Sequence, residues 1–88
     1  DATENGTIRF YPVPFTTSTV LDIKVSEDVS GEAVVYDLFG REVMSWRLNA
    51  SAGETKLALD FSNYPAGVYL CRVTLGDHVF QEKITKVQ

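Results

Sequence analysis

The sequence predicts an all-β domain built as an antiparallel sandwich. Apolar and polar residues alternate with a period of two in several segments, which places successive side chains on opposite faces of a strand. Turn-forming residues separate these segments about every 8–12 residues, and no segment has the period of an amphipathic helix. We therefore expect a seven-stranded antiparallel immunoglobulin-like β-sandwich, with a small barrel as the alternative.

Length and composition fit one small domain. The chain has 88 residues, of which 44% are hydrophobic and 23% are charged. A chain of this size buries roughly 60% of its unfolded surface around a single core. It contains no run of about 18 apolar residues that could span a membrane, and its first residues lack the segments of a signal peptide. Any export signal is therefore expected outside this chain.

The first predicted strand follows the end of a linker. Residues 1–6 are polar and end in an Asn-Gly turn pair, so we assign them to a linker and residues 7–88 to the folded domain. Residues 7–11 favour a strand, which Pro12 and Pro14 end because proline cannot donate a hydrogen bond to a ladder. Such a strand belongs at a sheet edge.

The middle of the chain predicts a strand followed by a hairpin. Residues 19–25 alternate cleanly, and residues 26–31 form the next turn. One face of the 19–25 strand would carry Leu21, Ile23 and Val25, and the other Val20, Asp22 and Lys24. Residues 32–36 favour a strand, and Asp-Leu-Phe-Gly at 37–40 fits a type I turn whose glycine can take a positive φ. Residues 41–48 return as the partner strand with an open register. One face would carry Glu42, Met44, Trp46 and Leu48, and the other Arg41, Val43, Ser45 and Arg47.

The last three predicted strands include the segment best suited to the core. Residues 49–53 form a small-residue loop, and residues 54–61 alternate again. Residues 65–75 open with proline and glycine and continue in strand-forming residues, so we expect a central strand. Its core side is predicted to carry Tyr69, Cys71, Val73 and Leu75. A Gly-Asp pair at 76–77 turns the chain tightly into a last strand over residues 78–87.

Charge and reactive residues argue against several functions. The formal charge of −4 is spread along the chain, which argues against a nucleic-acid partner. The single Cys71 cannot form an internal disulfide, and we expect it to be buried. One histidine and one cysteine offer neither a catalytic triad nor a closed zinc site, although a loop calcium site at Glu27 and Asp28 stays open. We therefore predict no enzyme activity and no cofactor.

Three aromatic residues allow an alternative function. Tyr11, Phe15 and Trp46 could form an exposed platform of an immunoglobulin-like accessory module that binds glycans or protein beside a secreted enzyme. In a domain this small, such residues more often cover an edge or fill the boundary of the core. We expect the structural role for them.

Four segments in one order resemble motifs of the C-terminal sorting domain, type A family, of cargo proteins of the bacterial type IX secretion system. Tyr-Pro-Val-Pro-Phe at 11–15 resembles the opening Tyr-Pro-Asn-Pro-Phe motif, with Val13 in place of the usual asparagine. Residues 36–43 and 65–73 resemble the middle and third motifs, and residues 83–88 are similar to the lysine-bearing terminus. The matching motif positions are Tyr11, Pro12, Pro14, Asp37, Gly40, Arg41, Pro65, Gly67 and Tyr69.

The resemblance implies the last domain of a larger secreted protein of the Bacteroidota, with a sorting function. It implies that the cargo passes through the periplasm, and that the type IX translocon and its outer-membrane shuttle barrel protein recognise the domain. A sortase-like cysteine protease would then remove the domain at the linker, which leaves the cargo released or attached to the cell surface. A weak homodimer through the sheet edges stays open.

The C-terminal segment is the relatively basic end of the chain. Residues 78–88 carry two lysines and one glutamate, in a chain whose formal charge is −4. A terminal edge strand also offers unpaired backbone groups to which a partner strand can add. We predict that the translocon recognises Lys83, Lys86, Val87 and Gln88. The alternative is that these lysines are solvated charges that protect the edge from pairing.

Overall fold

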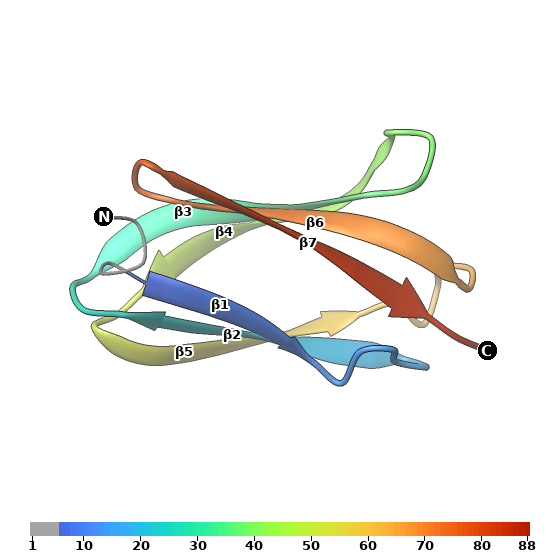
Figure 1. Ribbon diagram of the computed structural model, residues 1–88, viewed down its shortest axis with the longest axis horizontal. Coiled ribbons are helices and arrows are strands. Elements are labelled where there is room, and N and C mark those ends of the chain that lie inside the picture. The colour runs from blue at the N-terminus through green and yellow to red at the C-terminus, as the bar shows by residue number, and fades with distance from the viewer. Residues whose placement is uncertain (1–5) are drawn as a thin grey trace.

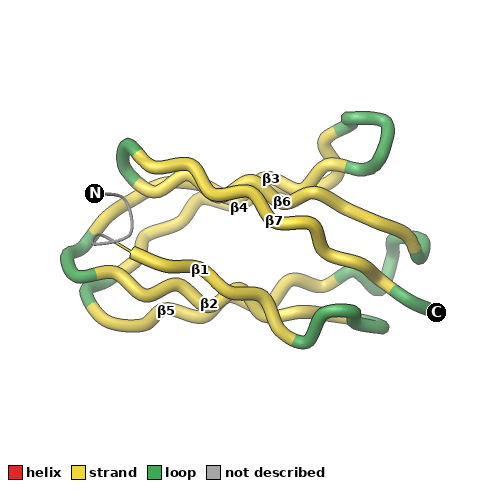
Figure 2. Tube along the Cα trace, viewed as in Figure 1, coloured by secondary structure: helices red, strands yellow, loops and turns green. Residues whose placement is uncertain are grey.

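The computed structural model describes residues 6–88, and it contains seven strands within them. The predicted linker lies outside the described residues except for Gly6, which begins the first strand. The described chain consists of strands joined by loops and turns, as Figure 2 shows. The strands are β1 (Gly6–Tyr11), β2 (Ser18–Val25), β3 (Val29–Tyr36), β4 (Glu42–Ala50), β5 (Gly53–Asp60), β6 (Gly67–Leu75) and β7 (His78–Lys86).

The strands form two packed sheets. One sheet has the order β1-β2-β5 and the other has the order β4-β3-β6-β7, and every strand pair is antiparallel. The two sheets lie face to face, with β1 and β7 on the same side of the sandwich (Figure 1). The prediction of an all-β antiparallel sandwich is confirmed, as is the edge position of the first strand. β6 is an interior strand between β3 and β7.

On each strand, every second side chain points inward, and these side chains fill the space between the two sheets. Leu21 and Ile23 of β2 are fully buried, as are Cys71 and Val73 of β6. The predicted core side of β6 is therefore confirmed. Burying these apolar side chains stabilises the fold by about 2 kcal/mol for each large residue, and in a domain with one cysteine this packing has no disulfide to support it.

Two predicted loops were too long because their glycines and small residues belong to strands. β3 begins at Val29, so three residues of the predicted 26–31 turn are in the sheet. A Cβ on Gly31 would lie 1.7 Å from the carbonyl oxygen of Thr74, so this glycine permits a close approach of β6 and does not form a turn. The predicted 49–53 loop also shrinks, because β4 continues to Ala50 and β5 begins at Gly53.

The structure settles the open register of β4. Trp46 lies opposite Ala33 and Met44 lies opposite Val35, so both side chains face the interior together with Leu48. A bulge between Val35 and Tyr36 shifts the register before this point and pairs Tyr36 with Glu42. Because of this bulge, neither of the two faces predicted for residues 41–48 points to one side along the whole strand.

Candidate recognition surface

The C-terminal half of β7 is fixed to the segment that follows β1. The backbone N–H of Phe15 donates to the carbonyl of Thr85 at 3.0 Å, and the N–H of Val87 donates to the carbonyl of Phe15 at 2.7 Å. These bonds form an isolated parallel bridge between Phe15 and Lys86. The opening motif and the C-terminus are therefore joined directly, although they lie at opposite ends of the chain.

An aromatic cluster packs beneath this bridge. The ring of Phe61, which is fully buried, lies 4.8 Å from the ring of Phe15 and 5.1 Å from that of Tyr69 between centroids. Tyr64 meets the same ring edge-on at 6.1 Å. The hydroxyl of Tyr69 donates to the carbonyl of Pro65, so the two motif positions Pro65 and Tyr69 fix the entry into β6. Aromatic pairs in such tilted geometry add to the energy of burial.

Lys86 bonds to the backbone of the same cluster. Its ammonium group donates to the carbonyl of Phe61 at 2.9 Å and to the carbonyl of Tyr64 at 2.6 Å. The half-buried Lys86 therefore directs its charge into the 61–64 loop of its own domain. Among the other predicted recognition residues, Val87 uses its N–H in the Phe15 bridge and exposes 41% of its surface, and Gln88 is exposed.

The N-terminal half of β7 has an open edge. The carbonyl of Thr85 and the N–H of Val87 point away from β6, and backbone groups alternate in direction along an antiparallel strand. The backbone groups of Val79, Gln81 and Lys83 therefore also point outward. Within residues 6–88 no strand pairs with that side of β7. Lys83 is exposed and lies opposite Leu70 in the β6–β7 ladder, on the outer face of the sheet.

The middle motif builds a rigid turn between β3 and β4. One carboxylate oxygen of Asp37 accepts from the N–H groups of Phe39 at 2.8 Å and Arg41 at 3.0 Å, and the other accepts from Arg41 Nε at 2.8 Å. Desolvation raises the pKa of Asp37, but these hydrogen bonds and the Arg41 charge outweigh it and lower the pKa overall. Gly40 closes the turn with a φ of 82° and donates to the carbonyl of Asp37, which confirms the predicted turn.

This turn exposes two residues that the sequence analysis missed. Leu38 is 74% exposed and Phe39 is 83% exposed. They lie on the turn whose backbone the bonds of Asp37 fix. The sequence held a signal for them, since the central positions of a four-residue hairpin turn face solvent whatever residues occupy them.

The remaining motif positions also have structural roles. The carbonyl of Pro12 accepts from the hydroxyl of the buried Thr19 at 3.0 Å, and the peptide bonds before Pro12 and Pro14 are both cis. Gly67 begins β6 with a φ of 155°, a conformation that other residues rarely adopt. Tyr11 lies half-buried on the outside of the three-stranded sheet.

Comparison with known families agrees with these features. A family model described as "Secretion system C-terminal sorting domain" matches residues 9–87. The chain belongs to this family. A comparison with curated proteins gave no match.

Membership in this family identifies the general function of the domain. It is a C-terminal sorting signal for type IX secretion, which implies interaction with the type IX machinery and a secreted or cell-surface protein. A sorting-signal family is not a family of enzymes. No helix in residues 6–88 is long and apolar enough to cross a membrane.

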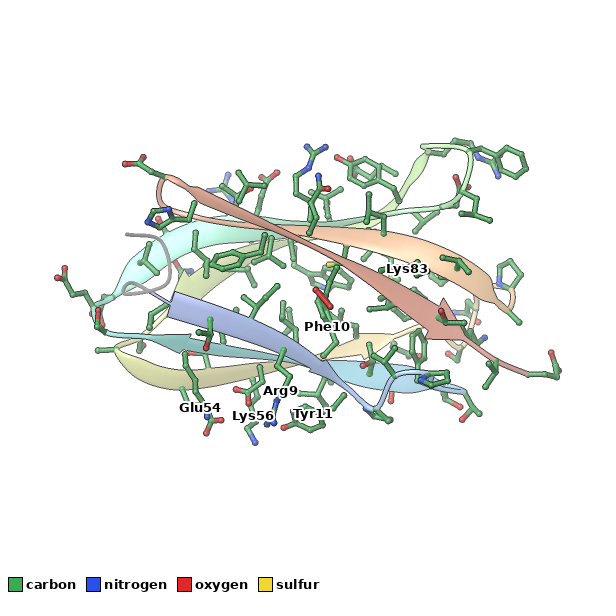
Figure 3. All side chains as sticks on the ribbon, viewed as in Figure 1. Arg9, Phe10, Tyr11, Glu54, Lys56 and Lys83 are labelled. Carbon is green, nitrogen blue, oxygen red and sulfur yellow. The ribbon has the colours of Figure 1, made fainter. Side chains whose placement is uncertain are left out.

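The aromatic residues of the alternative function do not form one exposed platform in the sorting domain. Phe15 is 2% exposed, Trp46 packs half-buried against the core, and Tyr11 lies between two cations. The guanidinium of Arg9 is 4.8 Å from the Tyr11 ring centroid and the ammonium of Lys56 is 5.6 Å from it (Figure 3).

Beneath these side chains lies a buried carboxylate that alternation had assigned to a polar face. Asp22 is 2% exposed, and one of its oxygens accepts from Arg9 at 3.3 Å. Its neighbours across the sheet are Arg9 of β1 and Lys56 of β5. The buried charge of Asp22 is therefore compensated by cations from both neighbouring strands.

Asp28 and Cys71, two other residues considered for metal binding or reactivity, are engaged or buried within the domain. A carboxylate oxygen of Asp28 accepts from the N–H of Ala52 at 2.8 Å, and no set of three potential metal ligands gathers in the part of the chain that the structure describes. Cys71 is fully buried, as predicted, and burial raises the pKa of its thiol to about 12. A thiol with this pKa stays protonated at neutral pH and is a poor nucleophile.

Proposed function

We propose that the type IX translocon recognises this sorting domain by adding a strand to the open half of β7, with Lys83 at the contact. The observation that carries the proposal is the difference along β7: the bridge to Phe15 covers its end, while the outward groups of residues 79, 81 and 83 have no partner strand in residues 6–88. Main-chain hydrogen bonds supply affinity in strand addition, and neighbouring side chains supply specificity.

The four predicted recognition residues divide between two roles in this proposal. Lys83 is exposed and contacts the translocon directly. Lys86 and Val87 position the strand through their bonds to the 61–64 loop and to Phe15, and Gln88 follows them into solvent. A charge held by two backbone carbonyls is unsuited to a second partner, which supports a positioning role for Lys86.

Processing by a sortase-like cysteine protease is proposed for the linker before the sandwich. Proteases bind an extended, accessible chain, and the backbone from Gly6 to Tyr11 is paired with β2. Peptide bonds within β1 are therefore protected in the folded domain. We place cleavage before β1, after passage of the cargo through the periplasm and recognition by the translocon and its shuttle barrel protein.

The test is a reporter fused to this domain and exported in a bacterium with a type IX system. Gln81→Pro removes one outward N–H without touching the ladder to β6, and Gln81→Ala is the matched control that keeps the N–H. We expect the amount of reporter at the cell surface to fall about fivefold in the proline variant, which corresponds to the loss of one hydrogen bond of about 1 kcal/mol. The alanine variant should match the wild type.

A charge reversal tests the second part of the proposal. Lys83→Glu should also reduce delivery, whereas Lys24→Glu, which changes an exposed lysine on the other sheet, should not. Normal delivery of both Gln81→Pro and Lys83→Glu, with unchanged melting temperatures, would refute recognition at this edge. Sedimentation of the purified wild-type domain and of the Gln81→Pro variant tests whether the same edge also pairs two copies of the domain.

A further inference from the structure

A shallow groove lies on the outer face of the four-stranded sheet, next to the turn between β3 and β4. Its volume is about 510 Å³, and its lining includes Tyr36, Leu38, Val68, Leu70, Arg72 and Lys83. The 37–41 turn, which contributes Asp37, Leu38 and Gly40 to the lining, rises above the sheet (Figure 1). Its centre is apolar, although it faces away from the core of the sandwich.

Large apolar side chains at the groove are held in solvent. Leu38 and Leu70, which line the groove, are 74% and 38% exposed, and Phe39, on the turn beside the groove, is 83% exposed. These are three of the six large apolar residues with exposed surfaces in residues 6–88. The bonds of Asp37 fix the backbone of the turn, and the Arg41 guanidinium lies 5.3 Å from the Phe39 ring centroid. A preorganised apolar side chain loses little conformational entropy when a partner covers it, so such residues are suited to anchor an interface.

Two cations border the same apolar centre. Arg72 lies over the Tyr36 ring at 5.3 Å, and Lys83 lies opposite Leu70 across the β6–β7 ladder. Neither has an ion pair with a carboxylate of residues 6–88, whereas the charge of the nearby Asp37 is taken by Arg41. In a chain with a formal charge of −4, this cationic border is a local exception. It is complementary to a partner that carries carboxylates.

We propose that this groove is a second docking surface for the type IX machinery, and that it binds an extended protein segment with a large apolar side chain flanked by carboxylates. The inference rests on the proposed function and deepens it. Lys83 belongs to both surfaces, since its backbone lies on the open edge of β7 and its side chain lines the groove. A strand added beside β7 extends the outer face of the sheet, so the residues that continue from it reach the groove.

The experiment uses the exported reporter fusion with a double variant, Leu38→Ser together with Phe39→Ser. Both side chains are exposed, and the bonds of Asp37 involve the backbone N–H groups of Phe39 and Arg41 and the Arg41 side chain, so the turn is retained. We expect delivery to fall about tenfold or more, which is the effect of losing two apolar anchors. Val13→Ser, which changes an exposed apolar residue outside the groove, is the matched control and should be delivered normally. Arg72→Glu provides a second variant and should also reduce delivery.

A photo-crosslinking residue at position 38, which lines the groove, identifies the occupant. The expected result is an adduct with an outer-membrane protein of the type IX machinery, and no such adduct from position 49 at the other end of the sheet. Normal delivery of both groove variants, or an adduct only between two copies of this domain, overturns the inference. Loss of delivery in Gln81→Pro with normal delivery of the groove variants rejects the groove and keeps the edge. Failure of the unaltered fusion to be delivered rejects the proposed function itself.

Discussion

The two halves of β7 differ although they belong to one continuous strand. In the C-terminal half Ile84 is fully buried, Thr85 and Val87 bond to Phe15, and Lys86 bonds to the 61–64 loop. In the N-terminal half Val79 is 59% exposed, and the outward backbone groups have no partner strand in residues 6–88. The C-terminal half of β7 is therefore bonded into the domain, whereas the outer edge of the N-terminal half is accessible to a partner.

In this short domain, the residues that stabilise the fold differ from the groups that are available to a partner. The motif residues that identify the family lie in turns and in the closed end, where Asp37, Pro65 and Tyr69 each bond to the domain itself. The groups left for a partner are outward backbone atoms and side chains such as Lys83 and Phe39. A substitution at a motif position is therefore expected to reduce secretion through loss of stability. Three experiments test this division.

The largest effect is expected from Phe61→Ala at the closed end. The ring is fully buried and contacts the rings of Phe15, Tyr64 and Tyr69, so its removal leaves a cavity that all three border. We expect a loss of about 3–5 kcal/mol in the free energy of unfolding, measured by urea denaturation. Phe39→Ala, which removes an exposed ring, should change stability by less than about 0.5 kcal/mol. Similar losses in both variants would contradict the division.

A smaller effect is expected when the two lysines of β7 are each changed to methionine. Lys86→Met keeps the apolar stem but removes the side-chain donor of the Tyr64 carbonyl and one of the two donors of the Phe61 carbonyl, which should cost about 2 kcal/mol. Lys83→Met removes an exposed charge and should alter stability by less than about 0.5 kcal/mol. Delivery of the reporter should follow the melting temperature for Lys86→Met and fall without a change in melting temperature for Lys83→Met. An unaltered stability of Lys86→Met would show that its two bonds contribute nothing.

The smallest effect, measured over one pH unit above pH 9, concerns the core behind the middle of β7. Cys71 pairs with Glu82 across the ladder, and burial raises its pKa from 9.0 to about 12. Below pH 9 the thiol is protonated in both the folded and the unfolded chain, so it does not affect the pH dependence of stability. Between pH 9 and about 12 only the unfolded chain ionises it, which lowers stability by up to about 1.4 kcal/mol per pH unit.

Cys71→Ala is the control for this measurement, because every other titrating group is retained. The two free energies of unfolding should approach each other as the pH rises above 9. Parallel curves would mean that water reaches the thiol in the folded protein, and that the sheet behind the open edge is not closed.

Local patterns predicted much of this protein because local rules decide them. Alternation in β2 and β6 identified the side chains of the core, and the Asp-Leu-Phe-Gly segment identified the turn with Gly40 at positive φ. Asp22 shows where such rules stop. Its place on the polar face was predicted, but its burial depends on Arg9 and Lys56, which two other strands bring beside it.

The sequence by itself determined the succession of seven strands along the chain, the core side of β6, the tight turns and the sorting-domain motifs. Each of these depends on a residue and its near neighbours in the chain, or on the order of motifs along it. Only the tertiary structure decided which half of β7 is closed and which lysine is exposed. Lys86 bonds to carbonyls 25 and 22 residues away, and Phe15 pairs with the opposite end of the chain. Contacts at this separation arise when the two sheets pack, so the same residue type serves as a support at position 86 and is exposed at position 83.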